Sequence, residues 1–150
     1  MNIENAGTGV LLNLLEGGEE TVKTWQGSLG KTIASLSMKV ECDKFYDKDV
    51  DVLHFAFTDG TRIKVWDDGQ SCCEQRYMQT DDNLSDYIGA QLLGGEVRDA
   101  PGTGDEYEVH EVQFFVVKTS KGQFTMCTHN EHNGYYGGFD LKVAPCGDQG

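Results

Sequence analysis

Basic residues, prolines and long apolar runs are all scarce in this sequence. Only 12 lysines and arginines stand against 25 aspartates and glutamates, so the formal net charge is −13 at pH 7. A charge of this sign repels phosphate backbones and anionic membrane surfaces, which argues against direct nucleic-acid or membrane binding. No stretch approaches the ~18 apolar residues that a membrane span needs, and no basic segment precedes an apolar run at the start. We therefore expect a cytoplasmic protein.

Cysteines are also few, and they form no regular framework. An odd number with two adjacent positions does not suggest paired disulfides, so reduced thiols are the simplest state. A nucleophilic cysteine working with His110 or His129 is an alternative, but no spacing sets up such a pair, and buried, inert cysteines are more common. The cysteines are Cys42, Cys72, Cys73, Cys127 and Cys146.

The sequence is rich in glycine and in alternating apolar residues. Nineteen glycines against two prolines indicate many tight turns, and the stretches between them are rich in the Val, Phe, Tyr and Thr residues that favour strands. Leu53, Phe55 and Phe57 alternate with polar residues, Asp59-Gly60 supplies a turn, and residues 61–66 run back. This pattern predicts a β-hairpin.

The second half of the chain repeats this pattern. Residues 112–118 and 123–129 alternate apolar and polar positions on either side of Ser120-Lys121-Gly122, which predicts another hairpin. Asn133-Gly134 marks a further tight turn, and we expect a returning strand over residues 135–143. The exposed edges of such a sheet are where a homodimer would form.

Two segments have helical patterns. Leu29, Ile33 and Leu36 follow helical spacing within residues 28–36, and Asp81-Asp82-Asn83 can cap a short second helix. The chain has the length of one domain, and no internal repeat or linker divides it. We expect a single domain over 1–150 with a mainly β (α+β) fold, an antiparallel curved sheet or partly open barrel that carries one or two short helices.

The densest set of metal-ligating side chains lies in residues 129–139, HNEHNGYYGGF. His129 and Glu131 would share one face of a strand, and a turn at Asn133 would swing His132 toward them, which gives a nitrogen and oxygen set suited to a divalent metal. The spacing differs from the helical zinc-protease motif. In a purely structural alternative the Asn and Glu side chains satisfy the turn, the histidines bond nearby backbone, and no cofactor is needed.

The same segment also suggests a ligand pocket. Tyr135 and Tyr136 offer flat stacking surfaces, and the neighbouring glycines allow close approach to the backbone. In the segment CCEQRYM, Arg76 can bind a phosphate or carboxylate, or alternatively form an internal pair with Glu74. The candidate ligand-binding residues are Arg76, His129, Asn130, His132, Tyr135 and Tyr136.

The blocks CCExRYM (72–78) and HNEHNGYYGGF (129–139) resemble the signatures of a family of uncharacterised small proteins from phages, prophages and bacteria. The resemblance covers about residues 50–143, and it leaves the role of the N-terminal residues 1–40 open. The family carries no established activity or catalytic residues. The resemblance implies a small protein that acts on host machinery in the cytoplasm of a bacterial host.

Three functions follow from these observations. The first is a non-enzymatic binding protein that sequesters a small nucleotide-like ligand or signal to counter host defence. The second is an acidic inhibitor that blocks a basic host or defence protein by direct binding, as a nucleic-acid mimic. The third is a metal-dependent hydrolase or lyase that uses His129, Glu131 and His132 with Glu74 as base. We favour the two binding functions over the enzyme, with the small-molecule pocket slightly ahead of the protein-blocking surface.

Overall fold

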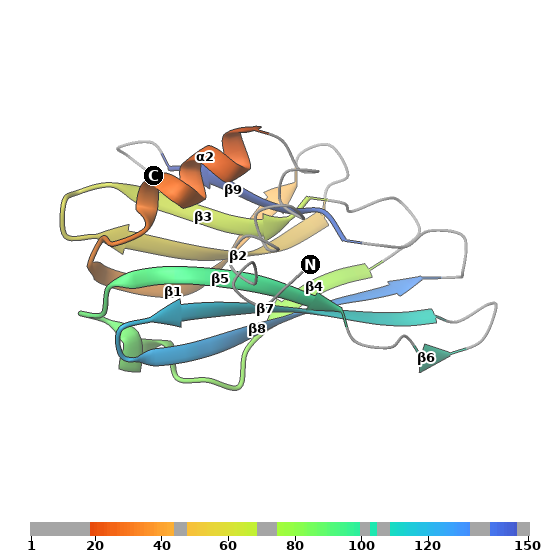
Figure 1. Cartoon of the computed structure of the whole chain (residues 1–150). Coiled ribbons are helices and arrows are strands. Elements are labelled where there is room, and N and C mark those ends of the chain that lie inside the picture. The colour runs from red at the N-terminus through yellow and green to blue at the C-terminus, as the bar shows by residue number, and fades with distance from the viewer. Residues whose placement is uncertain are drawn as a thin grey trace.

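The computed structural model describes residues 19–43, 48–68, 75–99, 103–104, 109–132 and 139–146, and it shows two facing antiparallel sheets (Figure 1). The prediction of a mainly β antiparallel fold is confirmed, and the sheets do not close into a barrel. The first sheet has the order β1 (Ile33–Asp43), β2 (Lys48–Phe57), β3 (Arg62–Asp67) and β9 (Leu141–Pro145). The second has the order β4 (Gln75–Gln79), β8 (Gly122–His132), β7 (Val109–Thr119) and β5 (Leu92–Asp99), with β6 (Thr103–Gly104) beside β7.

Both predicted hairpins are confirmed. The β2–β3 turn contains Gly60 at φ +92°, and the β7–β8 turn contains Gly122 at φ +114°, a backbone region that residues with a Cβ rarely adopt. Along β2 the alternating Leu53, Phe55 and Phe57 all face the other sheet and are at most 3% exposed. The period-two pattern therefore identified the buried face correctly.

The prediction of a helix over residues 28–36 is wrong. The helix in this region, α2 (Glu19–Ser28), ends where the predicted one begins, and β1 starts at Ile33. The strand register shifts between Ile33 and Ser35, so β1 carries a bulge there. The extra residue turns both Ile33 and Leu36 into the core, three positions apart, and this spacing imitates a helix.

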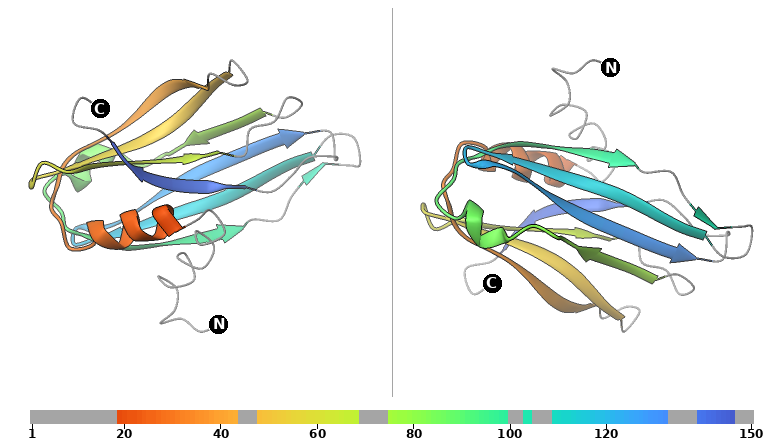
Figure 2. Two further views of the ribbon diagram at one scale, coloured as in Figure 1. Left: turned by 90° about the horizontal axis from the view of Figure 1, so that it is seen from above. Right: turned by 90° about the horizontal axis from the view of Figure 1, so that it is seen from below.

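Helix α2 lies beside the edge strand β9 and covers one side of the space between the sheets (Figure 2). Its Trp25 is 1% exposed and meets Phe55 and Phe115 edge-on, at ring-centre distances of 6.2 and 5.4 Å. On β5, Gly95 leaves room for the indole, because a Cβ there would lie 2.9 Å from the Trp25 ring. No helix within the described residues is both long enough and apolar enough to cross a membrane.

Backbone hydrogen bonds join the two sheets at one end. Ile33 donates its N–H to the carbonyl of Ala90 at 2.8 Å, Gly89 donates to Ile33 at 2.8 Å, and Leu92 donates to Lys31 at 2.9 Å. The predicted second helix precedes this link as a single 3-10 turn, η2 (Leu84–Tyr87). Part of the N-terminal region, from residue 19 onward, thus supplies α2 and β1 to the same body as the hairpins.

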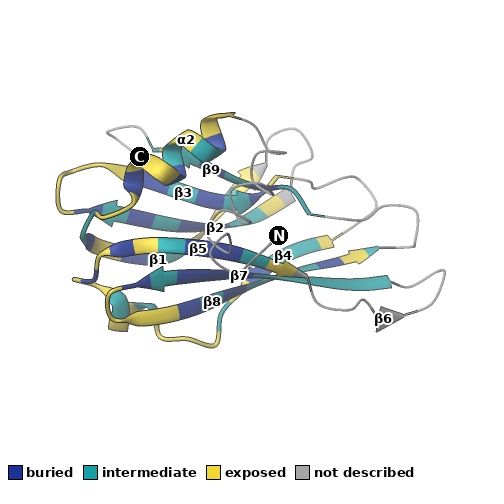
Figure 3. Ribbon diagram, in the orientation of Figure 1, coloured by how far each residue is buried: buried dark blue, intermediate teal, exposed yellow. Residues whose placement is uncertain are grey.

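Buried residues line the strands of both sheets (Figure 3), and their chemistry changes along the strands. Near the backbone link it is apolar, and the side chains there are almost fully buried: Ile33, Phe57, Leu92, Val117 and Phe124. We call these five residues the apolar end. Toward the opposite end of the strands the buried side chains include charged and amide groups. Several of the predicted site residues lie at this end.

Candidate functional site

Strand β8 separates the predicted site residues onto two faces of its sheet. It stays extended through His132, which pairs with Val109 of β7. Because side chains alternate along a strand, His129 and Glu131 point outward, whereas Asn130 and His132 point between the sheets. The structure therefore does not bring His132 to His129 and Glu131, and no group of three His, Cys, Asp or Glu among the described residues can hold a metal ion.

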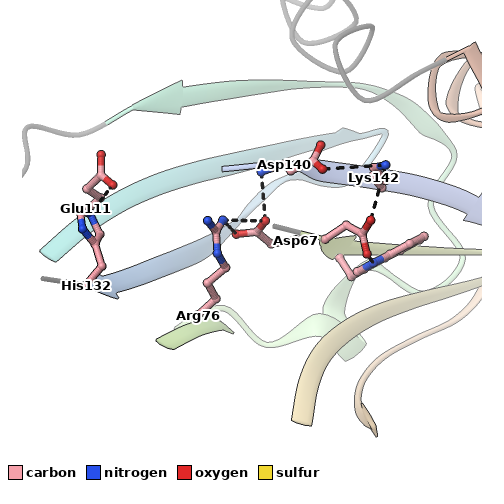
Figure 4. Close-up of polar contacts among 8 residues, drawn as sticks. Asp67, Arg76, Glu111, His132, Asp140 and Lys142 are labelled. Carbon is pink, nitrogen blue, oxygen red and sulfur yellow. Dashed lines mark hydrogen bonds and ion pairs between the residues drawn. The ribbon is translucent and has the colours of Figure 1, made fainter. Parts of the chain in front are cut away.

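Arg76 also points between the sheets, where it reaches across to Asp67 of β3 (Figure 4). Its Nη1 lies 3.0 and 2.8 Å from the two carboxylate oxygens, and the two side chains are only 7% and 6% exposed. Asp67 also accepts the backbone N–H of Asp140 at 3.0 Å. The sequence offered Glu74 as an internal partner, but Glu74 lies outside the described residues. The pair with Asp67 anchors β4 to the opposite sheet.

The buried polar groups continue beside this pair. His132 is 5% exposed and bonds Glu111 of β7 through Nε2 at 2.8 Å (Figure 4), and Asn130 is fully buried. We call Asp67, Arg76, Glu111, Asn130 and His132 the polar end of the interior. The cavity that adjoins Arg76 and Asp67 holds about 10 Å³, the room of one water molecule, so this cavity, as the described residues line it, has no space for a small-molecule ligand.

On the outer face, His129 belongs to a contiguous set of polar rings. It stacks on Tyr77 of β4, with ring centres 4.6 Å apart and planes 10° apart. Its Nδ1 lies 2.9 Å from Nε2 of His110 on β7. Burial first, and then the neighbouring His110, lower the pKa of His129, so at neutral pH the ring is uncharged.

Tyr77 holds the next residue on this face. Its hydroxyl donates to a carboxylate oxygen of Glu131 at 2.5 Å. That hydrogen bond, more than burial, raises the pKa of Tyr77 to about 12. Tyr135 and Tyr136, the other predicted aromatic ligands, lie outside the described residues.

Beyond His129 the outer face has an open recess of about 480 Å³. It is lined by Gln79, Thr80, Asp81, Asp82, Phe114, Thr125, Cys127 and His129, and we call it the outer recess. Asp82 accepts the backbone N–H of Thr125 at 2.8 Å, which fixes the loop after β4 against β8. Burial first, and then Asp81, raise the pKa of Cys127, so its thiol stays protonated at neutral pH. The lining contains no Lys or Arg.

Residues 26–141 match the family described as Domain of unknown function (DUF7448). The chain belongs to this family. The resemblance to an uncharacterised family is thereby confirmed, and the DUF7448 match begins earlier than the sequence suggested, so it includes β1. The chain matches none of the curated proteins and none of the solved structures with which it was compared.

Both the polar end and the outer recess lie within the part of the chain that matches DUF7448. Their chemistry differs, because the polar end contains the buried pairs Arg76–Asp67 and His132–Glu111, whereas the outer recess is open, aromatic and acidic. Sequence reasoning missed Phe114 and Cys127 as site residues. The predicted hairpin could have identified them. Its register sets Phe114 opposite Cys127, and Cys127 is two positions from His129 on the same face of the strand.

Proposed function

We propose that this protein is a non-enzymatic binding protein whose outer recess receives a basic side chain of a partner protein. The observation that carries the proposal is the lining of the recess, in which Asp81 and Asp82 lie with Phe114 and without a basic residue. Its volume of about 480 Å³ falls within the range of about 300–1,000 Å³ that is usual for ligand sites.

An arginine side chain fits this chemistry best. A guanidinium can lie over the face of Phe114 while it bonds the carboxylate of Asp81, and both interactions favour a cation. His129 is neutral and adds no opposing charge. The net charge of −13 would also speed the encounter with a basic surface. In the phage-like setting that the sequence implies, the partner would be a host or defence protein in the bacterial cytoplasm.

Sequestration of a small nucleotide-like ligand is the second proposal. It is supported by the stack of Tyr77 on His129, which shows that flat rings pack on this face. A base would enter the outer recess and leave its phosphates outside, because Asp81 and Asp82 repel anions and Arg76 points to the other face of the sheet. The metal-dependent enzyme is not proposed, since His132 lies away from His129 and Glu131.

Calorimetric titration with two peptides of equal length, one arginine-rich and one glutamate-rich, tests the proposal. We expect heat from the arginine-rich peptide only, weaker at high salt. Asp81→Asn and Phe114→Ala should each weaken binding about tenfold, or about 1.4 kcal/mol. Glu20→Gln removes the same charge from the exposed first turn of α2 and should leave the affinity unchanged.

Three results would contradict the basic-partner proposal. The first is no heat with the arginine-rich peptide, and the second is equal losses in Asp81→Asn and Glu20→Gln, which would indicate a general charge effect. The third is heat from a panel of nucleotides without heat from either peptide, which would support sequestration instead.

A further inference from the structure

Three side chains form a hydrogen-bonded chain on the outer face of the first sheet. His54 of β2 lies between Glu41 of β1 and Cys146, the residue that follows β9. Its Nε2 is 2.8 Å from Oε2 of Glu41, and its Nδ1 is 3.7 Å from Sγ of Cys146. This is the relation of a nucleophile, a base and a group that orients the base.

The contact with Glu41 determines which nitrogen of His54 can act as the base. An ionised carboxylate can only accept hydrogen bonds, so the contact with Glu41 places the imidazole proton on Nε2. The lone pair is then on Nδ1, the nitrogen that faces Cys146. His54 is only 17% exposed, which limits rotation of the ring away from this arrangement.

The strand pairing explains why these residues meet although 92 positions separate His54 from Cys146. Pro145 pairs with Ile63 on β3, and Cys146 donates its backbone N–H to the carbonyl of Arg62 at 2.9 Å. His54 pairs with Lys64 on the same strand. Cys146 is therefore held by backbone contacts rather than by its side chain alone.

The surroundings of Cys146 are locally basic within an acidic protein. Burial is the largest influence and raises the pKa of the Cys146 thiol; Lys64, Arg62 and Lys39 act in the opposite direction, whereas Glu41 raises the pKa further. The thiol is thus protonated at neutral pH and needs a base when it reacts. The nearby cations favour a reaction partner with negative charge. Lys64 also lies 3.6 Å from Glu41.

We propose that Cys146 is a nucleophilic site for small anionic carbon electrophiles, with His54 as its base and Glu41 as a positioning residue. In the reaction, Sγ forms a bond to the electrophilic carbon, the leaving group departs with its bonding electron pair, and the thiol proton moves to Nδ1 of His54. The carboxylate of Glu41 stabilises the resulting imidazolium. With iodoacetate, an S–C bond forms, the C–I bond breaks and iodide leaves.

A recess of about 190 Å³ lies next to Glu41, the positioning residue, although Cys146 and His54 are not among the residues that line it. Glu41, Lys64 and Trp66 contribute to its lining, and Nζ of Lys64 lies 5.2 Å from the centre of the Trp66 ring. The site lies on the first sheet, whereas the outer recess lies on the second, so this activity is separate from the proposed binding function.

Site-resolved alkylation of the full chain, followed by peptide mass spectrometry, tests the proposal. Iodoacetate and its neutral analogue iodoacetamide are used, and Cys127 serves as an internal reference because its thiol is also partly buried but lies near Asp81. We expect iodoacetate to favour Cys146 over Cys127, and iodoacetamide to do so less. Arg62→Gln should lower the iodoacetate rate at Cys146 more than the iodoacetamide rate, because it removes a cation that attracts only the anionic reagent.

Substitutions of His54 and Glu41 distinguish the role of the base from that of the positioning residue. His54→Gln should slow alkylation of Cys146 at neutral pH by about tenfold or more. Glu41→Ala should slow it several-fold, and Glu41→Gln, which keeps an acceptor for Nε2–H, should restore part of the rate. His110→Gln changes a histidine of the other sheet and should have no effect on Cys146.

Two results would overturn the proposal. One is equal alkylation of Cys146 and Cys127 by both reagents throughout the pH range. The other is an unchanged Cys146 rate in His54→Gln, checked to be folded by its denaturation midpoint, because the thiol would then react without its base. Failure of the peptide titration described above would not affect either readout.

Discussion

The two ends of the space between the sheets are held together by different physics. At the apolar end, Ile33, Leu92 and Phe124 are fully buried, and contact there is non-directional. At the polar end, Arg76 and Asp67 are almost as deeply buried but are satisfied only in one arrangement of their strands.

The difference separates stability from specificity. Apolar burial rewards any close packing of the sheets, so it tolerates small shifts of one strand against another. A buried charged pair does not, because a shift of one residue would turn Arg76 to the outer face and leave Asp67 alone. We infer that the apolar end supplies most of the folding free energy, and that the polar end fixes how β3, β4 and β9 are aligned.

The largest effect is expected at the apolar side of the comparison. Phe124→Ala, at the apolar end, removes a fully buried ring that packs against Tyr87, and it should lower the free energy of unfolding by about 4 kcal/mol. Urea denaturation measures this loss, which should not depend on salt. The control Leu93→Ala, at a side chain 55% exposed, should change stability by less than about 0.5 kcal/mol. Equal effects of the two variants would contradict the assigned core.

A slightly smaller loss is expected at the polar end. Arg76→Ala leaves the Asp67 carboxylate buried without its cation and should cost about 3 kcal/mol. The double variant Arg76→Met with Asp67→Asn removes both charges and keeps an acceptor for the N–H of Asp140. It should recover more than half of the loss in the same urea assay. A double variant as unstable as the single one would show that charge pairing is not the cause.

The ion pairs at the margin of the polar end should matter much less. Lys142 lies 3.5 Å from Asp68 and 3.8 Å from Asp140, and all three side chains are substantially exposed. Lys142→Ala should therefore lower stability by less than about 1 kcal/mol, and the difference from the unaltered protein should vanish at high salt. If Lys142→Ala lowered the free energy of unfolding as much as Arg76→Ala and independently of salt, the exposed ion pairs would not differ from the buried pair as proposed.

The smallest effect concerns His129, outside the interior altogether. Its pKa in the folded protein is lowered from the usual 6.5, so the unfolded chain binds a proton first as the pH falls. The contribution of this residue to stability is complete above pH 6.5 and is lost on acidification below it. NMR titration of the imidazole should give a pKa under 6.5, and His110→Gln should raise it. A value above 6.5 would contradict the shift.

The sequence predicted the hairpins because alternation and turn residues are local signals. It failed at β1, where a bulge between Ile33 and Ser35 converts an inward-facing strand into a pattern with helical spacing. The turns at Gly60 and Gly122 were predicted without this ambiguity. A positive φ depends on one glycine alone, whereas the spacing of apolar residues depends on the whole segment.

Among the described residues that the sequence predicted for ligand binding, only His129 lines the outer recess. His129, Glu131 and His132 are close in sequence, yet an unbroken strand sends the last of them to the other face. The partner of Arg76 proved to be Asp67, nine residues away and on the other sheet. The contact of His54 with Cys146 depends entirely on the pairing of β3 with β9, and no spacing in the sequence encodes it.

The backbone hydrogen bonds between residues 30–33 and 89–92 join the two sheets at one end, so this end can act as a hinge between them. Opening motions that separate the sheets can begin at the polar end while the hinge stays intact. The amide hydrogens of Ile33 and Leu92 should then exchange with solvent only on global unfolding, and those of β4 should exchange earlier. A partner that separates the sheets at the polar end would have to break the Arg76–Asp67 pair before it disturbed the backbone hydrogen bonds at the other end.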